Sequence, residues 1–286
     1  MASTLFKNLP LSNAFMFGEV MRRDESICKL FLEELLGCKI AKLKFINKEY
    51  DLADTKYSHG IRLDVYLADA NNTHYDIEMQ NSVEALERRC RYYQAGIDRR
   101  TLEKNAKYRD LPESYIIFVC NYDPYKLGYA RYERVMYIKD TDLVYDDGSH
   151  VIFLNTHYTE AGDTPKAITE YLDYARDNDD HAPFTTELAR EAVARTQQIR
   201  RNTEKEDSFM TFTQLLQERE DAAIEKGRLE GREEGRVEGR EEGRQENLAE
   251  VVATMLEQFS VKDIAAILKK PESVIQEIAD KISGKK

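Results

Sequence analysis

The chain has 286 residues, of which 42% are hydrophobic and 33% are charged, and its formal net charge is −11. That hydrophobic fraction supports a folded core and excludes wholesale disorder, while the length suits one sizeable domain with an appendage or two small domains. The apolar runs are far shorter than the roughly 18 residues that a membrane span needs, and the N-terminus has no signal-peptide pattern. We therefore expect a cytoplasmic protein that has no membrane partner.

The acidity is unevenly distributed along the chain. Residues 1–160 carry 22 Lys and Arg against 25 Asp and Glu, a net charge of −3, whereas residues 161–286 carry 20 against 28, a net charge of −8. Residues 84–109 hold eight basic and four acidic residues, a local net charge of +4. The whole-chain charge argues against a nucleic-acid partner, but this local excess leaves DNA binding open.

The hydrophobic spacing of the first half predicts alternating helices and strands. The expected helices cover residues 13–21 and 24–36, and the expected strands cover residues 40–50, 61–67 and 75–80. A long helix over residues 83–105 follows, and its apolar stripe would face a sheet: Leu86, Cys90, Tyr93 and Ile97. The continuous apolar run from Ser114 to Cys120 is typical of a strand covered on both faces. Further strand candidates lie at residues 131–138 and 150–154.

The four cysteines, Cys28, Cys38, Cys90 and Cys120, are scattered along the chain, and no two of them have CxxC spacing. Zinc sites and redox motifs usually contain closely spaced cysteine pairs. We therefore expect reduced thiols in the core, with a disulfide or zinc role as the alternative.

From residue 164 onward the pattern is helical to the end, and residues 225–244 read EKGR-LEGR-EEGR-VEGR-EEGR. Each glycine costs a helix about 1 kcal/mol relative to alanine. Two interpretations stay open: a solvated, partly frayed charged helix, or a smooth stripe that lets another helix approach closely. Short helices over 248–259, 261–268 and 272–282 would form a docking or capping bundle or, alternatively, a helix-turn-helix. The predicted parts are thus residues 1–160, a helical region over 161–247 and a small helical module over 248–286.

Two adjacent strands carry the candidate chemistry. If Asp64 lies opposite Glu78 in an antiparallel pair, Arg62 lies opposite Gln80, and directly opposed side chains share a face. Asp64, Glu78 and Gln80 then cluster, with Asp76 beside them. Carboxylate and amide oxygens suit Mg²⁺ or Mn²⁺, an ion that can activate water and neutralise charge on a phosphate. The alternative is a solvent-exposed sheet face on which Arg62 neutralises its neighbours.

Six segments in the first 160 residues have a distinctive sequence. They are FMFGEVM (15–21), GIRLDVYLAD (60–69), YDIEMQ (75–80), RCRYYQAGID (89–98), SYIIFVCNYDP (114–124) and VIFLNT (151–156). Together they resemble the Rpn family of recombination-promoting nucleases and transposases, over roughly residues 4–250. The resemblance implies the α/β fold of the PD-(D/E)XK nuclease superfamily, a central mixed sheet flanked by helices, here with a helical C-terminal extension. It also implies a metal-dependent DNA endonuclease that promotes recombination.

The resemblance also implies roles for individual residues. Asp64 would be the motif aspartate and Glu78 the acid of the (D/E)xK element, and both would bind Mg²⁺ or Mn²⁺. Gln80 stands where the superfamily has lysine, so it brings no positive charge, but its amide can orient a water molecule or a phosphate oxygen. The superfamily often adds an acid from the first helix. Glu19 is the candidate for that acid, and an exposed surface glutamate is the alternative.

Arg88, Arg91 and Arg99 on the long helix would contact DNA phosphates without reading the base sequence. The alternative is a solvated helix face paired with nearby acids. Three functions compete for the whole chain. It is a metal-dependent DNA endonuclease, a nuclease-fold protein that binds DNA or a partner with little catalysis, or an assembly protein that forms a homo-oligomer through its C-terminal helices.

Overall fold

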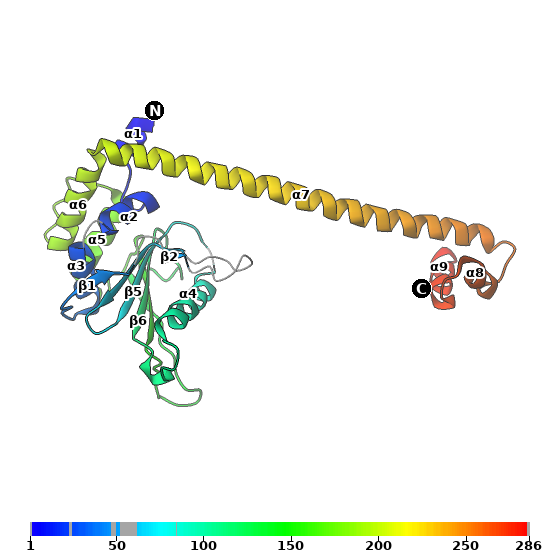
Figure 1. Ribbon diagram of the computed structural model, residues 1–286, viewed down its shortest axis with the longest axis horizontal. Helices are drawn as coiled ribbons and strands as arrows, with labels where there is room; N and C mark the ends of the chain where they lie inside the picture. The colour runs from blue at the N-terminus through cyan, green and yellow to red at the C-terminus, as the bar shows by residue number, and fades with distance from the viewer. Residues whose placement is uncertain (1, 23–24, 47–49, 52–61, 84, 285–286) are drawn as a thin grey trace. The chain divides into compact units, whose positions relative to one another are not determined.

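The computed structural model describes residues 2–22, 25–46, 50–51, 62–83 and 85–284 (Figure 1). They group into two compact units, one ending at Phe212 and one beginning at Thr213. Helix α7 (Thr203–Met255) contributes residues to both units. None of the described helices combines the length and apolarity that crossing a bilayer requires.

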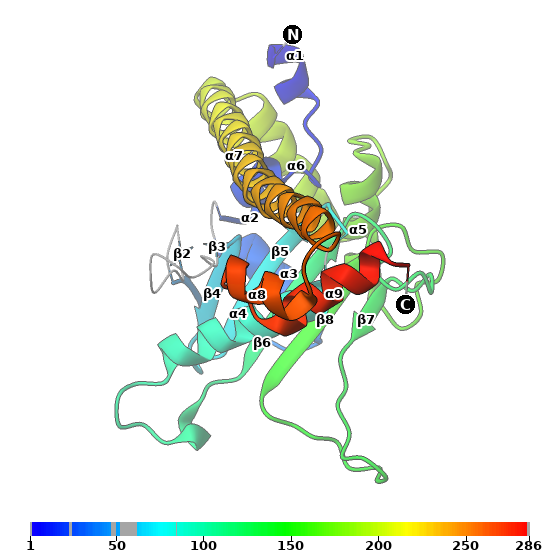
Figure 2. The same cartoon turned by 90° about the vertical axis from the view of Figure 1, so that its right-hand side faces the viewer.

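A six-stranded sheet lies at the centre of the first unit. Its strands, in spatial order, are β1 (Leu43–Phe45), β4 (Val65–Asp69), β5 (His74–Gln80), β6 (Ser114–Cys120), β8 (Ser149–Asn155) and β7 (Arg131–Glu133). Strand β6 runs parallel to both β5 and β8, and the other neighbours are antiparallel (Figure 2). A separate antiparallel pair consists of β2 (Tyr50–Asp51) and β3 (Arg62–Leu63).

Helices cover both faces of this sheet (Figure 1). One face packs against α2 (Ala14–Arg22), α3 (Glu25–Leu36), α5 (Lys166–Asp177) and α6 (Glu187–Arg200). The other face packs against α4 (Leu86–Thr101). The remaining elements of the first unit are α1 (Ala2–Lys7) and a short 3₁₀ helix, η1 (Tyr108–Asp110). The expected mixed sheet flanked by helices, with a helical C-terminal extension, is confirmed.

The two-residue period of the strands assigns their side chains to these faces. Ile77, Ile117 and Ile152 lie side by side in register and belong to the core under α2, α3, α5 and α6. Phe118 and Phe153 point to the opposite face and pack in the core beneath α4. The predicted apolar stripe of α4 is confirmed, because its four members are the buried residues of this helix.

Several strands are shorter than the sequence pattern predicts. Residues 47–49, within the strand expected over 40–50, lie outside the described residues, as does Ile61. The strand expected over 61–67 is interrupted by a bend at Asp64. The backbone N–H of Asp64 donates to the Glu78 side chain at 2.7 Å. This N–H is therefore not available for the backbone hydrogen bonds between the strands. The strand expected over 131–138 shortens to β7.

All four cysteines are free thiols. Cys28, Cys90 and Cys120 are buried, which confirms the expectation of reduced core thiols for these three. The expectation is wrong for Cys38, which is exposed just after the C-terminal end of α3.

The second unit contains most of α7, followed by α8 (Val261–Leu268) and α9 (Glu272–Ile282). The helix expected to begin at Leu248 is wrong as a separate element, because α7 continues without a break to Met255. The predictions for α8 and α9 are confirmed. Val252 of α7 completes their small core together with Ile264, Ala265 and Ile275.

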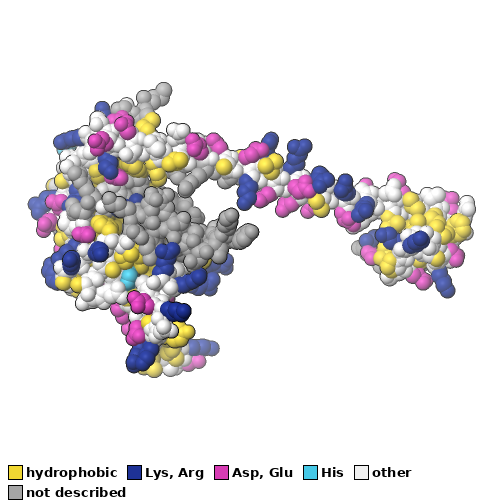
Figure 3. Space-filling view, viewed as in Figure 1, with side chains coloured by type: hydrophobic (Ala, Val, Ile, Leu, Met, Phe, Trp, Pro, Cys, Tyr) yellow, Lys and Arg dark blue, Asp and Glu magenta, His cyan; other side chains and the backbone are white. Residues whose placement is uncertain are grey.

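The glycine repeat lies within α7 and its side chains are exposed. Figure 3 shows acidic and basic side chains interleaved along this helix. A Cβ atom added at the five repeat glycines would meet nothing within 4 Å: Gly227, Gly231, Gly235, Gly239 and Gly243. Within the described part of the chain, therefore, the repeat is a charged, exposed helix.

Candidate functional site

The pairing of β4 with β5 brings two predicted site residues together. Val65 lies opposite Ile77, so one further step along the register places Asp64 opposite Glu78. The Asp64 N–H donates to Glu78 Oε1 at 2.7 Å, and the Met79 N–H donates to Asp64 Oδ2 at 3.3 Å. The carboxylate of Asp64 is thereby fixed against the backbone of β5. In the small sheet, the backbone of Arg62 lies opposite that of Asp51 in the strand register.

The polar face of β5 is buried beneath α4. Asp76, Glu78 and Gln80 alternate on this face and are only 0%, 1% and 4% exposed. Their register partners on β6 include Phe118, which belongs to the core under α4. The alternative of a solvent-exposed sheet face is therefore wrong for these three residues.

Arg89 of α4 reaches into this face and is a member of the cluster that the sequence interpretation missed. Its Nη2 donates to Glu78 Oε2 at 2.8 Å and its Nη1 donates to Gln80 Oε1 at 2.6 Å. Its Nε donates to the Tyr93 hydroxyl at 2.8 Å. Its position in the sequence could have indicated that it points inward, because it lies directly before Cys90 and four residues before Tyr93, both of which belong to the buried stripe.

On the other side, α2 contributes a second arginine. Arg22 Nε donates to the backbone carbonyl of Asp64, and its Nη2 lies 3.9 Å from Asp64 Oδ1. Glu19 of the same helix instead forms an ion pair with Lys205, with 2.5 Å between Glu19 Oε2 and Lys205 Nζ. The described contacts thus bring Arg22, and not Glu19, to the Asp64 carboxylate.

Burial determines the electrostatics of the cluster. It raises the pKa of Glu78 to about 8, and the charge of Asp64 adds to this, while Arg89 and the hydrogen bond from the Asp64 N–H oppose it. Burial and the charges of Glu78 and Asp64 likewise hold the pKa of Asp76 well above its ordinary value. Both Asp76 oxygens are buried and receive no hydrogen bond. Since two carboxylates have no proton to donate to each other, Asp76 and Glu78 require a shared proton or a cation.

The cluster fits a divalent cation by its donor chemistry. Asp64, Asp76 and Glu78 supply carboxylate oxygens, the ligand type that Mg²⁺ and Mn²⁺ prefer. When ionised, these three carboxylates exceed the charge of the two guanidinium groups that contact the cluster, Arg22 and Arg89. Within the described residues, no group of three or more His, Cys, Asp or Glu side chains is already arranged around an ion position. Asp64 and Glu78 would hold the ion after a local rearrangement.

The predicted phosphate-binding arginines lie apart from the carboxylates. Arg88, Arg91 and Arg99 are exposed, on the side of α4 away from its buried stripe. Figure 3 shows Lys and Arg side chains gathered on the side of the first unit where Figure 1 places α4. The described contacts to Glu78 and Gln80 come from Arg89 and not from these three side chains.

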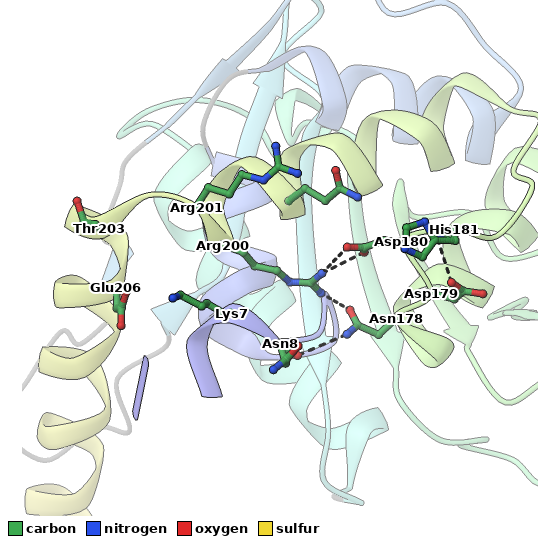
Figure 4. Close-up of a pocket in the computed structure, with 11 residues that line it drawn as sticks. Lys7, Asn8, Asn178, Asp179, Asp180, His181, Arg200, Arg201, Thr203 and Glu206 are labelled. Atoms are coloured by element: carbon green, nitrogen blue, oxygen red, sulfur yellow. Dashed lines mark hydrogen bonds and ion pairs between the residues drawn. The ribbon is translucent and has the colours of Figure 1, made fainter. Parts of the chain in front are cut away.

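A cavity of about 730 Å³ lies elsewhere in the first unit, where α6 meets α7 (Figure 4). The buried guanidinium of Arg200 points toward Asp180 and Asn178, and it donates to Asp180 Oδ2 at 2.9 Å and to the Leu9 carbonyl at 2.8 and 3.0 Å. None of the carboxylate-cluster residues lines this cavity. We interpret the Arg200 network as a structural junction between chain segments that are distant in sequence.

Comparison with known proteins gives one finding. A family model described as PD-(D/E)XK nuclease family transposase matches residues 14–222. The matched region contains the six-stranded sheet, α4 and the carboxylate cluster. Neither a curated protein nor a solved structure is similar enough to count as a match.

The raised pKa of Glu78 predicts how the free energy of unfolding of the metal-free protein depends on pH. Between the ordinary value of 4.5 and about 8, the folded state keeps a proton that the unfolded state releases. The free energy of unfolding should therefore fall as the pH rises from 5 to 8, by on the order of 1 kcal/mol per pH unit. Urea unfolding in EDTA measures this fall, and Glu78→Gln should flatten it. Asp163→Asn, which changes an exposed carboxylate, should leave the slope unaltered, and an equal slope for all three proteins would contradict the prediction.

Proposed function

Because the chain belongs to the PD-(D/E)XK nuclease family of transposases, we propose that it hydrolyses phosphodiester bonds in DNA with the help of Mg²⁺ or Mn²⁺. The observation that carries this proposal is that Asp64 and Glu78 are held together at the bend between β3 and β4, where Glu78 Oε1 accepts from the Asp64 N–H and Asp64 Oδ2 accepts from the Met79 N–H. The Asp76 oxygens beside them, which are buried and receive no hydrogen bond, support it, because they give the cluster a demand for a proton or a cation.

Each residue of the cluster has a distinct part in this proposal. Asp64 and Glu78 hold the ion, which supplies, when bound, activation of water and neutralisation of the charge that builds on the phosphate. Gln80 is fixed at both ends of its amide, since Nε2 donates to Ser82 Oγ at 3.1 Å and Oε1 accepts from Arg89. Because Nε2 also donates to the Ser82 carbonyl, the group left to act is Oε1, whose second lone pair can orient a water molecule without a charge of its own.

The exposed arginines of α4 would bind the substrate. Arg88, Arg91 and Arg99 present positive charge to solvent within the segment whose local net charge is +4. Arginine pairs well with phosphate, and such contacts position a duplex without reading its sequence. DNA is the proposed partner, bound through its backbone and with an affinity that falls as salt increases.

A second candidate function is DNA binding or partner binding with little cleavage. Arg89 neutralises Glu78, and Gln80 lacks the positive charge that lysine would supply. With Glu78 paired to Arg89 and no lysine in the site, the protein would bind DNA but cleave it slowly. The promotion of recombination, a cytoplasmic location, the role of Glu19 as a metal ligand and the division into 1–160, 161–247 and 248–286 stay predictions.

Removing the proposed ligands should abolish cleavage. Asp64→Ala and Glu78→Ala should each lower the rate of Mg²⁺-dependent plasmid nicking by about 100-fold or more, because the charge on the transition state loses its stabilisation. Agarose gel electrophoresis of supercoiled plasmid measures the nicked product.

The matched control for these variants is Asp163→Ala, which removes a carboxylate from an exposed loop and should cut like the wild type. Equal cutting by all four proteins would rule out the proposed site. If none of them cuts over a range of metals and salts while the wild type still binds DNA, the second candidate function replaces the first.

Replacing Arg88, Arg91 and Arg99 together by alanine should weaken DNA binding in a salt-dependent way. Each lost phosphate contact lowers the slope of log K against log salt by about 0.9, so the slope should fall by about 3. Fluorescence anisotropy with a labelled duplex measures it, in an Asp64→Ala background that prevents cleavage.

The control replaces three exposed lysines of the same unit by alanine: Lys126, Lys139 and Lys166. This variant loses the same formal charge as the arginine variant but should keep the wild-type slope. Equal slopes for both triple variants would place the DNA contacts outside α4.

The open glycine stripe of α7 supports association of two copies through the C-terminal helices, because nothing within the described chain packs against it. Size-exclusion chromatography with light scattering should give a larger oligomer for the full chain than for a chain ending at Asp221. The first compact unit is intact in the shorter chain. The same oligomeric state for both would refute association through these helices.

A further inference from the structure

We propose that Arg89 is the resident counter-ion of the carboxylate cluster and competes with the divalent ion for Glu78, so that the ion binds only when the Arg89–Glu78 pair opens. This inference rests on the proposed function and adds a control step to it. It assigns Arg89 the role of a competitor of the ion, which neither the family match nor the sequence pattern indicates.

The contacts of Glu78 show where the competition takes place. Oε1 accepts the Asp64 N–H at 2.7 Å, a bond that belongs to the backbone and fixes the bend. Oε2 accepts from Arg89 Nη2 at 2.8 Å. Of these two contacts, the one to Arg89 is made by a side chain that can rotate away. Glu78 Oε2 is therefore the oxygen that an ion would gain when Arg89 moves.

The charges make the two states mutually exclusive. Glu78 is buried, so interactions between charges at this position are screened far less than in water. A divalent ion on Glu78 would repel a guanidinium held 2.8 Å from the same carboxylate. By linkage, whatever stabilises the Arg89–Glu78 pair weakens ion binding by the same factor.

Other contacts hold Arg89 in place while it is paired with Glu78, and its exposure gives it a path away. Its guanidinium carbon lies 5.0 Å from the centre of the Tyr93 ring and 5.3 Å from that of Phe118, which is within cation–π range. The Tyr93 hydroxyl accepts from Nε at 2.8 Å. The side chain of Arg89 is 26% exposed, so its rotation leads toward solvent. The pair can open without leaving a charge in apolar surroundings.

Calorimetric titration of the full-length, DNA-free protein with MnCl₂ at pH 9 under argon, where Glu78 of the wild type is ionised, tests the proposal. Arg89→Met removes the competing charge and should bind Mn²⁺ about tenfold more tightly than the wild type, within the usual range of coupling between two sites. Arg89→Lys keeps a positive charge and should remain close to the wild type. If Arg89 merely maintained the shape of the site, Arg89→Met would bind the ion more weakly.

A second variant covers the case in which Arg89→Met fails to fold. Tyr93→Phe removes the hydroxyl that holds Nε but keeps the ring and the arginine, so it should bind Mn²⁺ a few-fold more tightly. Unchanged or weaker binding in the folded variants, with normal binding by the wild type, overturns the inference and leaves the proposed function intact. Absence of Mn²⁺ binding in every protein overturns both.

Discussion

The burial of an acidic strand face beneath a helix is the constraint on which the arrangement of the first unit depends. Helix α4 covers this face of β5, so the polar side chains there have almost no access to water and must find partners within the protein. Arg89 of α4 meets this demand for Glu78 and Gln80, whereas the Asp76 oxygens receive no hydrogen bond. Arg22 of α2 contacts Asp64 at the neighbouring bend. These helices belong to different layers, and the cluster therefore connects both sides of the sheet through Asp64 and Glu78.

The same constraint explains why α4 combines an apolar stripe with a partly buried arginine. The stripe positions the helix over Phe118 and Phe153, and one turn of the helix then places Arg89 above Glu78 and Gln80. The guanidinium of Arg89 on α4 thus lies beside Gln80, the position on β5 at which the superfamily has lysine. Because α4 and β5 are separate elements, the guanidinium of Arg89 can move relative to the Glu78 carboxylate. A lysine at the position of Gln80, two residues along the same strand, would have less freedom to do so.

Features set by short-range periodicity could be predicted from the sequence. The two-residue period of β5, the stripe of α4 and the opposition of Asp64 and Glu78 all follow from local spacing and antiparallel register. The contacts of Arg89 and Arg22 could not be predicted, because spacing assigns a long side chain to the border of a face but does not say whether it bends inward. The helix over the glycine repeat could also be predicted: glycine lowers helix propensity, but neighbouring Glu–Arg pairs such as Glu233 with Arg236 support the helix. The helix boundary expected at Leu248 is wrong, because α7 continues through it to Met255.

The unpartnered oxygens of Asp76 have a consequence for how this fold can change during evolution. A buried carboxylate without a hydrogen-bond donor makes the native state less stable than a neutral side chain of the same shape would. Selection for stability alone would therefore remove acidic residues from β5, whereas selection for ion binding retains them. Copies of such a gene that lose their activity are expected to drift toward neutral residues at this strand and to gain stability as they do so.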